Sequence, residues 1–344
     1  MNNDLNSVSV PDIYTINGAI WEMFQEANRI LVVSHVRPDG DAVGSLLGLG
    51  LALINAGKDV RMVLEDGVPA NFRHLPGSQQ IHRSAKLDTQ QPYDMVIVVD
   101  CSDLRRVGSV LGERQPDLNI DHHVTNLNFA RVNLVVPAQV ATSAIIAEYL
   151  RAWGLEFDQP IASALLTGIV TDTIGFRTSN MTSEALRLSA LMVEYGANLP
   201  ELYNLALINK TFEAARFWGM GLSQLEREEL PGGGALVWTR LTLEDRQEAS
   251  YPGNDDADLV NLLSTIESDI ALIFVEQKTG HVKISWRARA GFDVSQIALK
   301  FGGGGHAAAA GADIAGALEA VEKQVLDATR AMLTQIYQSS NIFA

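Results

Sequence analysis

The chain has few features of a secreted, membrane-embedded or disulfide-rich protein. It contains one cysteine, Cys101, which excludes an internal disulfide framework and a cysteine-rich zinc site. We expect Cys101 to be a small buried residue. No stretch approaches the roughly 18–20 apolar residues of a membrane-spanning helix, and residues 1–10 lack the basic and apolar regions of a signal peptide. A cytoplasmic protein without a membrane partner is therefore expected.

Basic residues are also scarce. The 26 lysines and arginines are outnumbered by 41 aspartates and glutamates, so the net charge is −15 at pH 7. Proteins that bind long nucleic acids usually carry a basic stripe that displaces counterions, and no such cluster occurs here. Any nucleic-acid ligand should be short, not a long duplex, and bound cations should offset the protein's own charge.

The chain contains the pattern of an α/β protein followed by a smaller α+β unit. Its 344 residues exceed the roughly 250–300 residues at which single cores stop growing. We predict domains at 1–190 and 212–344, joined by a helical linker at 191–211. In the first domain, strands alternate with helices, which favours a parallel sheet covered on both faces. Its predicted strands are 30–35, 59–65, 95–103 and 118–123, and its predicted helices are 40–56, 142–153 and 161–171.

The second domain is predicted to mix helices and strands in a different order. A helix is expected first, at about 212–229, and a C-terminal helix at about 314–337. Between them a glycine-rich loop at 301–305 leads to His306 and an alanine-rich helical run. The three predicted strands are 235–241, 270–277 and 281–288.

Acidic and histidine side chains stand at the ends of the predicted strands of the first domain. His35 ends the first strand, Asp100 ends the third, and Asp121, His122 and His123 end the fourth. In open parallel sheets, ligands bind beyond the carboxyl ends of the strands. The pattern therefore predicts that these distant residues meet in one crevice.

Further carboxylates complete a set typical of a metal site. Asp39 and Asp41 follow His35 in a tight turn, and Asp172 ends a predicted helix. Taken singly, such aspartates are more often helix caps or solvated turn residues. Together, four segments place carboxylates and imidazoles that suit Mn²⁺ or Mg²⁺. Two such cations form a clamp for phosphoryl transfer, so a two-metal site is predicted.

These residues also carry a family resemblance. The segments S-H-V-R-P-D-G-D-A-V-G-S, V-V-D-C-S-D, D-H-H and G-I-V-T-D-T, in that order, resemble the four motifs of the DHH phosphoesterase superfamily. The segment G-G-G-G-H-A-A-A-A-G at 302–311 resembles the signature of the associated DHHA1 domain. The resemblance implies a Rossmann-like catalytic DHH domain and a substrate-binding DHHA1 domain.

Within the superfamily, the length of the chain and its lack of appended domains are similar to those of the nanoRNase/pAp-phosphatase group. The resemblance implies hydrolysis of RNA oligomers of a few nucleotides, and of 3′-phosphoadenosine 5′-phosphate (pAp) to AMP. It also implies a homodimer. Alternatives are a phosphodiesterase for pApA or cyclic dinucleotides, a RecJ-like single-strand exonuclease, a family II pyrophosphatase, and a non-catalytic nucleotide-binding module.

The resemblance further implies a role for each site residue. Six residues would hold two divalent cations, Mn²⁺ by preference and Mg²⁺ as the alternative, with Asp100 bridging them. His123 would face the substrate phosphate, and Asp121 would orient a ligand imidazole. The implied metal ligands are His35, Asp39, Asp41, Asp100, His122 and Asp172.

Substrate contacts are expected from three places. In the glycine-rich loop at 301–305, glycines would allow backbone amides to approach a phosphate closely. The alternative for this loop is a flexible linker. His306 would contact phosphate or base, and Arg287 matches an arginine that contacts substrate in relatives. Arg177 could bind a phosphate in bidentate fashion, or be a surface residue. The glycines concerned are Gly303, Gly304 and Gly305.

Overall fold

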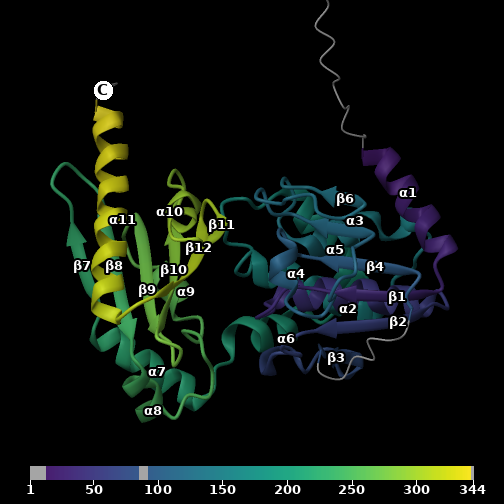
Figure 1. The fold of residues 1–344 in the computed structure, drawn as a ribbon, viewed down its shortest axis with the longest axis horizontal. Helices are drawn as coiled ribbons and strands as arrows, with labels where there is room; N and C mark the ends of the chain where they lie inside the picture. The colour runs from purple at the N-terminus through teal and green to yellow at the C-terminus, as the bar shows by residue number, and fades with distance from the viewer. Residues whose placement is uncertain (1–12, 85–91, 342–344) are drawn as a thin grey trace, which may run out of the picture. The chain divides into compact units, whose positions relative to one another are not determined.

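The computed structural model describes residues 13–84 and 92–341 (Figure 1). The chain forms two compact units, Met1–Asn209 and Lys210–Ala344. Each has its own sheet and its own hydrophobic core. The two units are described separately.

The first unit is built on a six-stranded sheet in the order β3-β2-β1-β4-β5-β6. Every pairing in it is parallel, so the predicted α/β class is confirmed. The short strands β3 and β6 were not predicted. The strands are β1 (Arg29–Val33), β2 (Asp59–Leu64), β3 (Ile81–Arg83), β4 (Met95–Val99), β5 (Leu118–Asp121) and β6 (Val132–Val135).

Both faces of this sheet are covered, because successive strand residues enter two different cores. In β1, Ile30 and Val32 belong to the larger core, whereas Leu31 and Val33 belong to the smaller one. The central helix α2 (Gly40–Asn55) is buried from Gly40 to Leu53, as expected for a helix that is apolar all round. The remaining helices are α1 (Ile13–Glu26), α3 (Thr142–Tyr149), α4 (Gln159–Asp172), α5 (Ser183–Glu194) and α6 (Leu199–Tyr203), with shorter turns η1 (Ala70–Phe72), η2 (Ser78–Gln80), η4 (Leu104–Val107), η5 (Leu150–Trp153) and η6 (Asn204–Ile208).

The second unit has a mixed six-stranded sheet in the order β11-β12-β10-β9-β8-β7. Only β8 and β9 pair in parallel; the other neighbours are antiparallel. Its strands are β7 (Glu226–Glu229), β8 (Ala235–Leu241), β9 (Ile270–Glu276), β10 (His281–Ala288), β11 (Gly304–His306) and β12 (Ala309–Ala315). Its helices are α7 (Phe212–Ser223), α8 (Leu243–Ala249), α9 (Leu259–Leu263), α10 (Ser295–Lys300) and α11 (Leu318–Asn341).

Three sequence predictions for this unit were wrong. The first helix ends at Ser223, and the next residues form β7. The glycine-rich and alanine-rich segments form the hairpin β11–β12 instead of a loop and a helix, because β12 pairs along β10 from His281 to Arg287. This pairing overrides the helix propensity of alanine. As a result, the C-terminal helix begins at Leu318 and not at about residue 314 as predicted.

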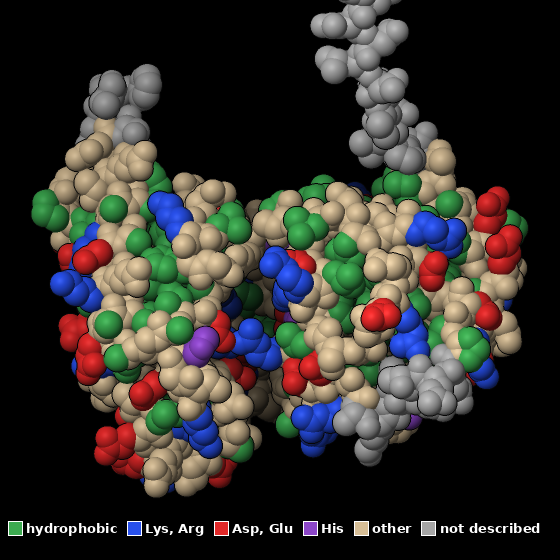
Figure 2. All heavy atoms as spheres, in the orientation of Figure 1, with side chains coloured by type: hydrophobic (Ala, Val, Ile, Leu, Met, Phe, Trp, Pro, Cys, Tyr) green, Lys and Arg blue, Asp and Glu red, His purple; other side chains and the backbone are tan. Residues whose placement is uncertain are grey.

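Among the described residues on the face drawn in Figure 2, basic side chains form no continuous stripe. Lysine and arginine side chains are scattered there among acidic ones. The part of the chain that the structure describes contains no helix with both the length and the apolar composition of a membrane span.

Candidate metal centre

The first unit brings the predicted acidic and histidine residues together at the carboxyl edge of its sheet. His35 lies two residues beyond β1, Asp100 directly follows β4, and Asp121 is the last residue of β5. The nearby ends of two helices add the other carboxylates. Asp39 caps the N-terminus of α2, Asp41 lies in its first turn, and Asp172 is the last residue of α4.

One group of ligand-type atoms forms around His35. Its Nε2 lies 3.5 Å from Oδ2 of Asp100 and 3.8 Å from Oδ2 of Asp39. His35 and Asp100 are each only 2% exposed, whereas Asp39 is open to solvent. The group therefore has two buried members and one exposed member.

A second group forms around His122. Its Nε2 lies 3.4 Å from Oδ2 of Asp172, 3.8 Å from Oδ1 of Asp100 and 3.9 Å from Oδ2 of Asp41. Asp100 thus faces the first group with Oδ2 and the second group with Oδ1. A carboxylate arranged in this way is suited to bridge two cations.

Both histidines are oriented as metal ligands usually are. Nδ1 of His35 lies 2.9 Å from the carbonyl oxygen of Val36, and Nδ1 of His122 lies 3.3 Å from that of Gln139. A carbonyl accepts only, so each Nδ1 carries a proton, and Nε2 is the ring nitrogen that faces the carboxylates and can bind a cation. When Nε2 is unprotonated, its lone pair and a carboxylate repel unless a cation lies between them.

The distances between the ligand-type atoms fit a cation bound between them. Ligand atoms about 2.1 Å from one cation, at angles of 90–110°, lie about 3.0–3.4 Å apart. The separations of 3.4–3.9 Å lie at the upper end of this range or slightly above it, and all exceed the roughly 2.7–3.2 Å of an ordinary N–H···O hydrogen bond. Nε2 of His35 is buried and makes no hydrogen bond within the described residues. The residues therefore fit divalent cations.

The electrostatics of the site point the same way. Burial, followed by the charge of Asp100, raises the pKa of Asp41 to about 7. Burial and then the charges of Asp41, Asp39 and Asp100 raise the pKa of Asp172 well above its ordinary value. For Asp100, burial is outweighed by the neighbouring histidines, so its pKa is lowered. The cluster holds more negative charge than its own histidines neutralise.

Sequence reasoning missed the groups that hold Asp41. The first backbone amides of α3, at Thr142 and Ser143, donate to Oδ2 and Oδ1 of Asp41 over 2.6 and 2.9 Å. The Ser45 hydroxyl adds a third donor at 3.2 Å. The Thr142 hydroxyl donates to Asp100 over 3.0 Å. The only sequence signal was the pair of hydroxyl residues at the start of a predicted helix.

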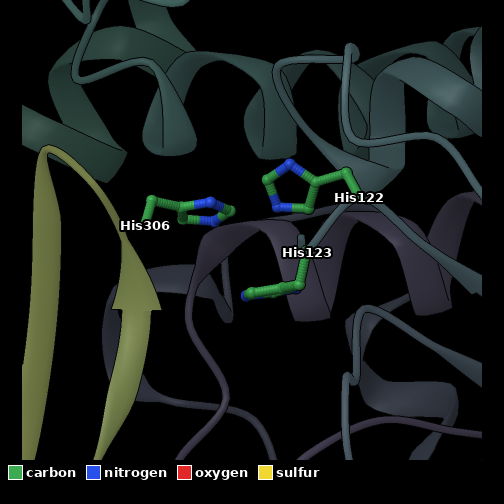
Figure 3. Close-up of side chains that lie close together, drawn as sticks. All are labelled: His122, His123 and His306. Carbon is green, nitrogen blue, oxygen red and sulfur yellow. The ribbon is translucent and has the colours of Figure 1, made fainter. Parts of the chain in front are cut away.

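Asp121, which was predicted to orient a metal-ligand imidazole, is hydrogen-bonded to the ring of His123. Its Oδ1 lies 2.7 Å from Nδ1 of that ring. The rings of His122 and His123 lie close together, with centroids 4.7 Å apart (Figure 3). Burial alone would lower the pKa of His123, but the hydrogen bond to Asp121 and the charge of Asp100 raise it. His123 is therefore a stronger base than an ordinary histidine.

Left-handed backbone marks two segments of the site. Asp100 has φ 53°, which ends β4 one residue before it and turns the side chain out of the strand alternation. Ile174, Gly175 and Phe176, a segment that begins two residues after Asp172, have φ values of 48°, 68° and 68°. Such conformations cost about 1–3 kcal/mol at non-glycine residues and cluster at functional sites. The second segment leads into Arg177, whose side chain is exposed.

The predicted substrate residues of the second unit lie on β10 and β11. Arg287 is half-buried near the end of β10, where its Nε donates to Asn261 over 3.1 Å. His306 is the last residue of β11. The close approach of this segment to β12 leaves no room for a side chain at two of the three glycines: a Cβ would lie 2.1 Å from the oxygen of Gly311 at Gly303, just before β11, and 2.5 Å from that of Ala309 at Gly305.

The raised carboxyl pKa values predict how stability depends on pH. A carboxyl with a raised pKa holds its proton more tightly in the folded state, so the metal-free protein should lose stability as pH rises from about 4 to 7. Metal binding requires the deprotonated carboxylate. We therefore expect the rise in melting temperature caused by Mn²⁺ to be at least about 3 °C larger at pH 8 than at pH 6.

Differential scanning fluorimetry would measure this difference. Potassium chloride at matched ionic strength is the control, and it should produce no pH-dependent rise. An Mn²⁺ effect that is equal at the two pH values would contradict the electrostatic argument.

Comparison with known proteins identifies the family. Residues 29–169 match the DHH family, N-terminal domain, and residues 253–338 match the DHHA1 domain. The chain is 34% identical over 307 residues to the bifunctional oligoribonuclease and PAP phosphatase NrnA of Thermus thermophilus, covering 89% of this chain and 90% of that protein. It is 29% identical to the protein of the same name from Mycoplasma genitalium, covering 84% and 90% of the two chains.

A solved structure shares the fold. An exopolyphosphatase-related protein from Bacteroides fragilis aligns with a TM-score of 0.82 and 23% identity, over 96% of this chain and 99% of that one. Both domains match in the predicted order, and the chain is 34% identical to a relative over most of both sequences. This chain therefore belongs to the DHH/DHHA1 phosphoesterase family, in its NrnA-like group.

Proposed function

We propose that this protein is a two-metal phosphoesterase that hydrolyses short oligoribonucleotides and removes the 3′-phosphate of pAp. The observation that carries the proposal is Asp100, which turns one oxygen to the His35 group and the other to the His122 group. The similarity to relatives named oligoribonuclease and PAP phosphatase supplies the substrate class.

His35 and Asp39 would hold one cation, and Asp41, His122 and Asp172 the other, with Asp100 shared. Mn²⁺ is the preferred ion, because a mixture of carboxylates and imidazoles suits it better than Mg²⁺. Bound there, the cations would supply Lewis acidity, offsetting phosphate charge and making water more acidic.

The chain's own side chains then bind and orient the substrate. Hydrolysis forms a bond from a water oxygen to phosphorus and breaks the ester bond, and the leaving oxygen takes a proton. His123 holds its Nδ1 proton against Asp121, so its Nε2 is the nitrogen that would contact a substrate phosphate. The raised pKa of His123 favours the protonated ring, which donates to an anionic oxygen. Arg177 would add a second cationic contact.

The second unit is proposed to bind the nucleotide. Arg287 and His306 would contact phosphate or base, and the backbone amides of Gly303, Gly304 and Gly305 would approach a phosphate. The net charge of −15 disfavours long strands and so favours short ligands. We also propose that the chain forms a homodimer, which light scattering on the purified protein would test.

A hydrolysis panel tests the function. With Mn²⁺ present, pAp and RNA dimers to pentamers, including the linear dinucleotide pApA, should be hydrolysed well, and long single-stranded DNA and pyrophosphate at least about tenfold more slowly. Chelation should lower activity by about 10³-fold or more, and added Mn²⁺ should restore it. Preference for long DNA would favour the RecJ-like alternative, preference for pyrophosphate the pyrophosphatase, and no turnover a binding module.

A further inference from the structure

A hydrogen-bonded chain of polar side chains lies behind His123. Oδ1 of Asp121 contacts Nδ1 of His123, and Oδ2 of Asp121 accepts from Nδ2 of Asn126 over 2.6 Å. The same Asn126 nitrogen lies 2.8 Å from Oδ1 of Asn119. Each oxygen of the Asp121 carboxylate therefore has its own side-chain partner.

The orientation of the Asn126 amide is set by its other contact. Its Oδ1 accepts the backbone N–H of Asn128 over 2.7 Å, so the oxygen cannot face Asp121. Asn119 is oriented as well, because its Nδ2 donates to the carbonyl oxygens of Val98 and Cys101 over 3.2 Å. Its Oδ1 is thereby turned to accept from Asn126. The direction of donation along this chain is unambiguous.

Because two members of this chain of side chains are buried, their polar groups need their hydrogen-bond partners. Asp121 and Asn119 are fully buried, and a buried carboxylate without donors is costly. With Asn126 in place, the carboxylate is fixed in rotation and its Oδ1 stays on the His123 ring. Without that donor, Oδ2 would lose its side-chain partner, and the carboxylate could rotate away from the ring.

We infer that Asn126 is a positioning residue for the reaction, acting on His123 through Asp121. It fixes the carboxylate that fixes the Nδ1–H tautomer, and so directs Nε2 of His123 to the substrate. Asn126 has no place in either cation group, so its effect should fall on turnover and not on metal binding. This inference rests on the proposed function, in which His123 contacts the substrate phosphate.

The test uses two variants and a matched control on the full-length protein with Mn²⁺. Asn126→Asp keeps the size of the side chain but removes the donor. Asn126→Ala removes the side chain altogether. We expect kcat for pAp and an RNA dimer to fall about 10–100-fold, with KM within about threefold and Mn²⁺ affinity by calorimetry unchanged. The control is Asn133→Asp in β6. The side chain of Asn133 bonds to the backbone of Ala130, just before that strand, and this variant should keep kcat.

A charge-swapped double variant separates positioning from general damage. In Asn126→Asp combined with Asp121→Asn, the donor and acceptor between the two positions are exchanged, and an amide oxygen can still accept from the Nδ1–H of His123. The double variant should therefore be more active than Asn126→Asp alone, by about fivefold or more.

Other outcomes overturn the inference. Retention of kcat in both Asn126 variants, loss of Mn²⁺ binding, failure of both variants to fold, or no recovery in the double variant would each do so. A wild-type protein that hydrolyses none of the substrates would instead reject the proposed function itself.

Discussion

The Asp100→Asn variant should fold, yet lose hydrolysis by about 10³-fold in kcat/KM, corresponding to about 4 kcal/mol. The amide keeps the shape of the carboxylate, but it has one acceptor oxygen where the carboxylate has two. It can therefore face only one of the two groups around His35 and His122 with oxygen. The Thr142 hydroxyl, which donates to Oδ1 of Asp100, can still be satisfied by an amide oxygen.

Metal binding provides a readout that does not depend on activity. Calorimetric titration should show at least one Mn²⁺ lost or its affinity lowered at least about 100-fold, and the melting-temperature rise caused by Mn²⁺ should shrink accordingly. Asp59→Asn is the control, because Asp59 is exposed at the start of β2, outside both cation groups, and its side chain pairs with Arg29. Activity of Asp100→Asn within tenfold of wild type would reject the bridging role.

The position of the site was predictable because it follows from topology. Alternating strands and helices dictate a parallel sheet, and a parallel sheet gathers all strand ends at one edge. This argument placed His35, Asp100 and His122 together without knowledge of their distances. Asp41 and Asp172 were added to the predicted set because the tight turn after His35 and the end of a predicted helix supply further carboxylates. The motif resemblance then implied which metal each of them would hold.

The contacts behind the site were not predictable. The partner of Asp121 depends on rotamers and on the turn that brings Asn126 back over β5, and no spacing rule encodes either. The amides that donate to Asp41 belong to the start of α3, about 100 residues further along the chain. Their position depends on how α3 packs against α2. The hairpin β11–β12 was missed because alanine favours helices locally, whereas β10 offers a long edge for pairing.

The Gly44→Ala variant should destabilise the first unit strongly. Helices α2 and α4 approach so closely that a Cβ at Gly44 would lie 2.5 Å from the carbonyl oxygen of Ala164 and 2.9 Å from the nitrogen of Gly168. Both are backbone atoms, which cannot move aside as a side chain can. We expect a loss of about 3 kcal/mol, or about 10 °C in the melting temperature of this unit.

A glycine on the same helix makes the matched control. A Cβ at Gly50 would meet the thioether of Met62, which is flexible and can repack, and alanine is favoured over glycine within a helix by about 0.8–1.0 kcal/mol. Gly50→Ala should therefore change the melting temperature by no more than about 3 °C. Mn²⁺ affinity should fall only in Gly44→Ala, because the spacing of α2 and α4 sets the distance between Asp41 and Asp172. If both variants lost stability and Mn²⁺ binding equally, close contact between the two helices would not be what holds these carboxylates together.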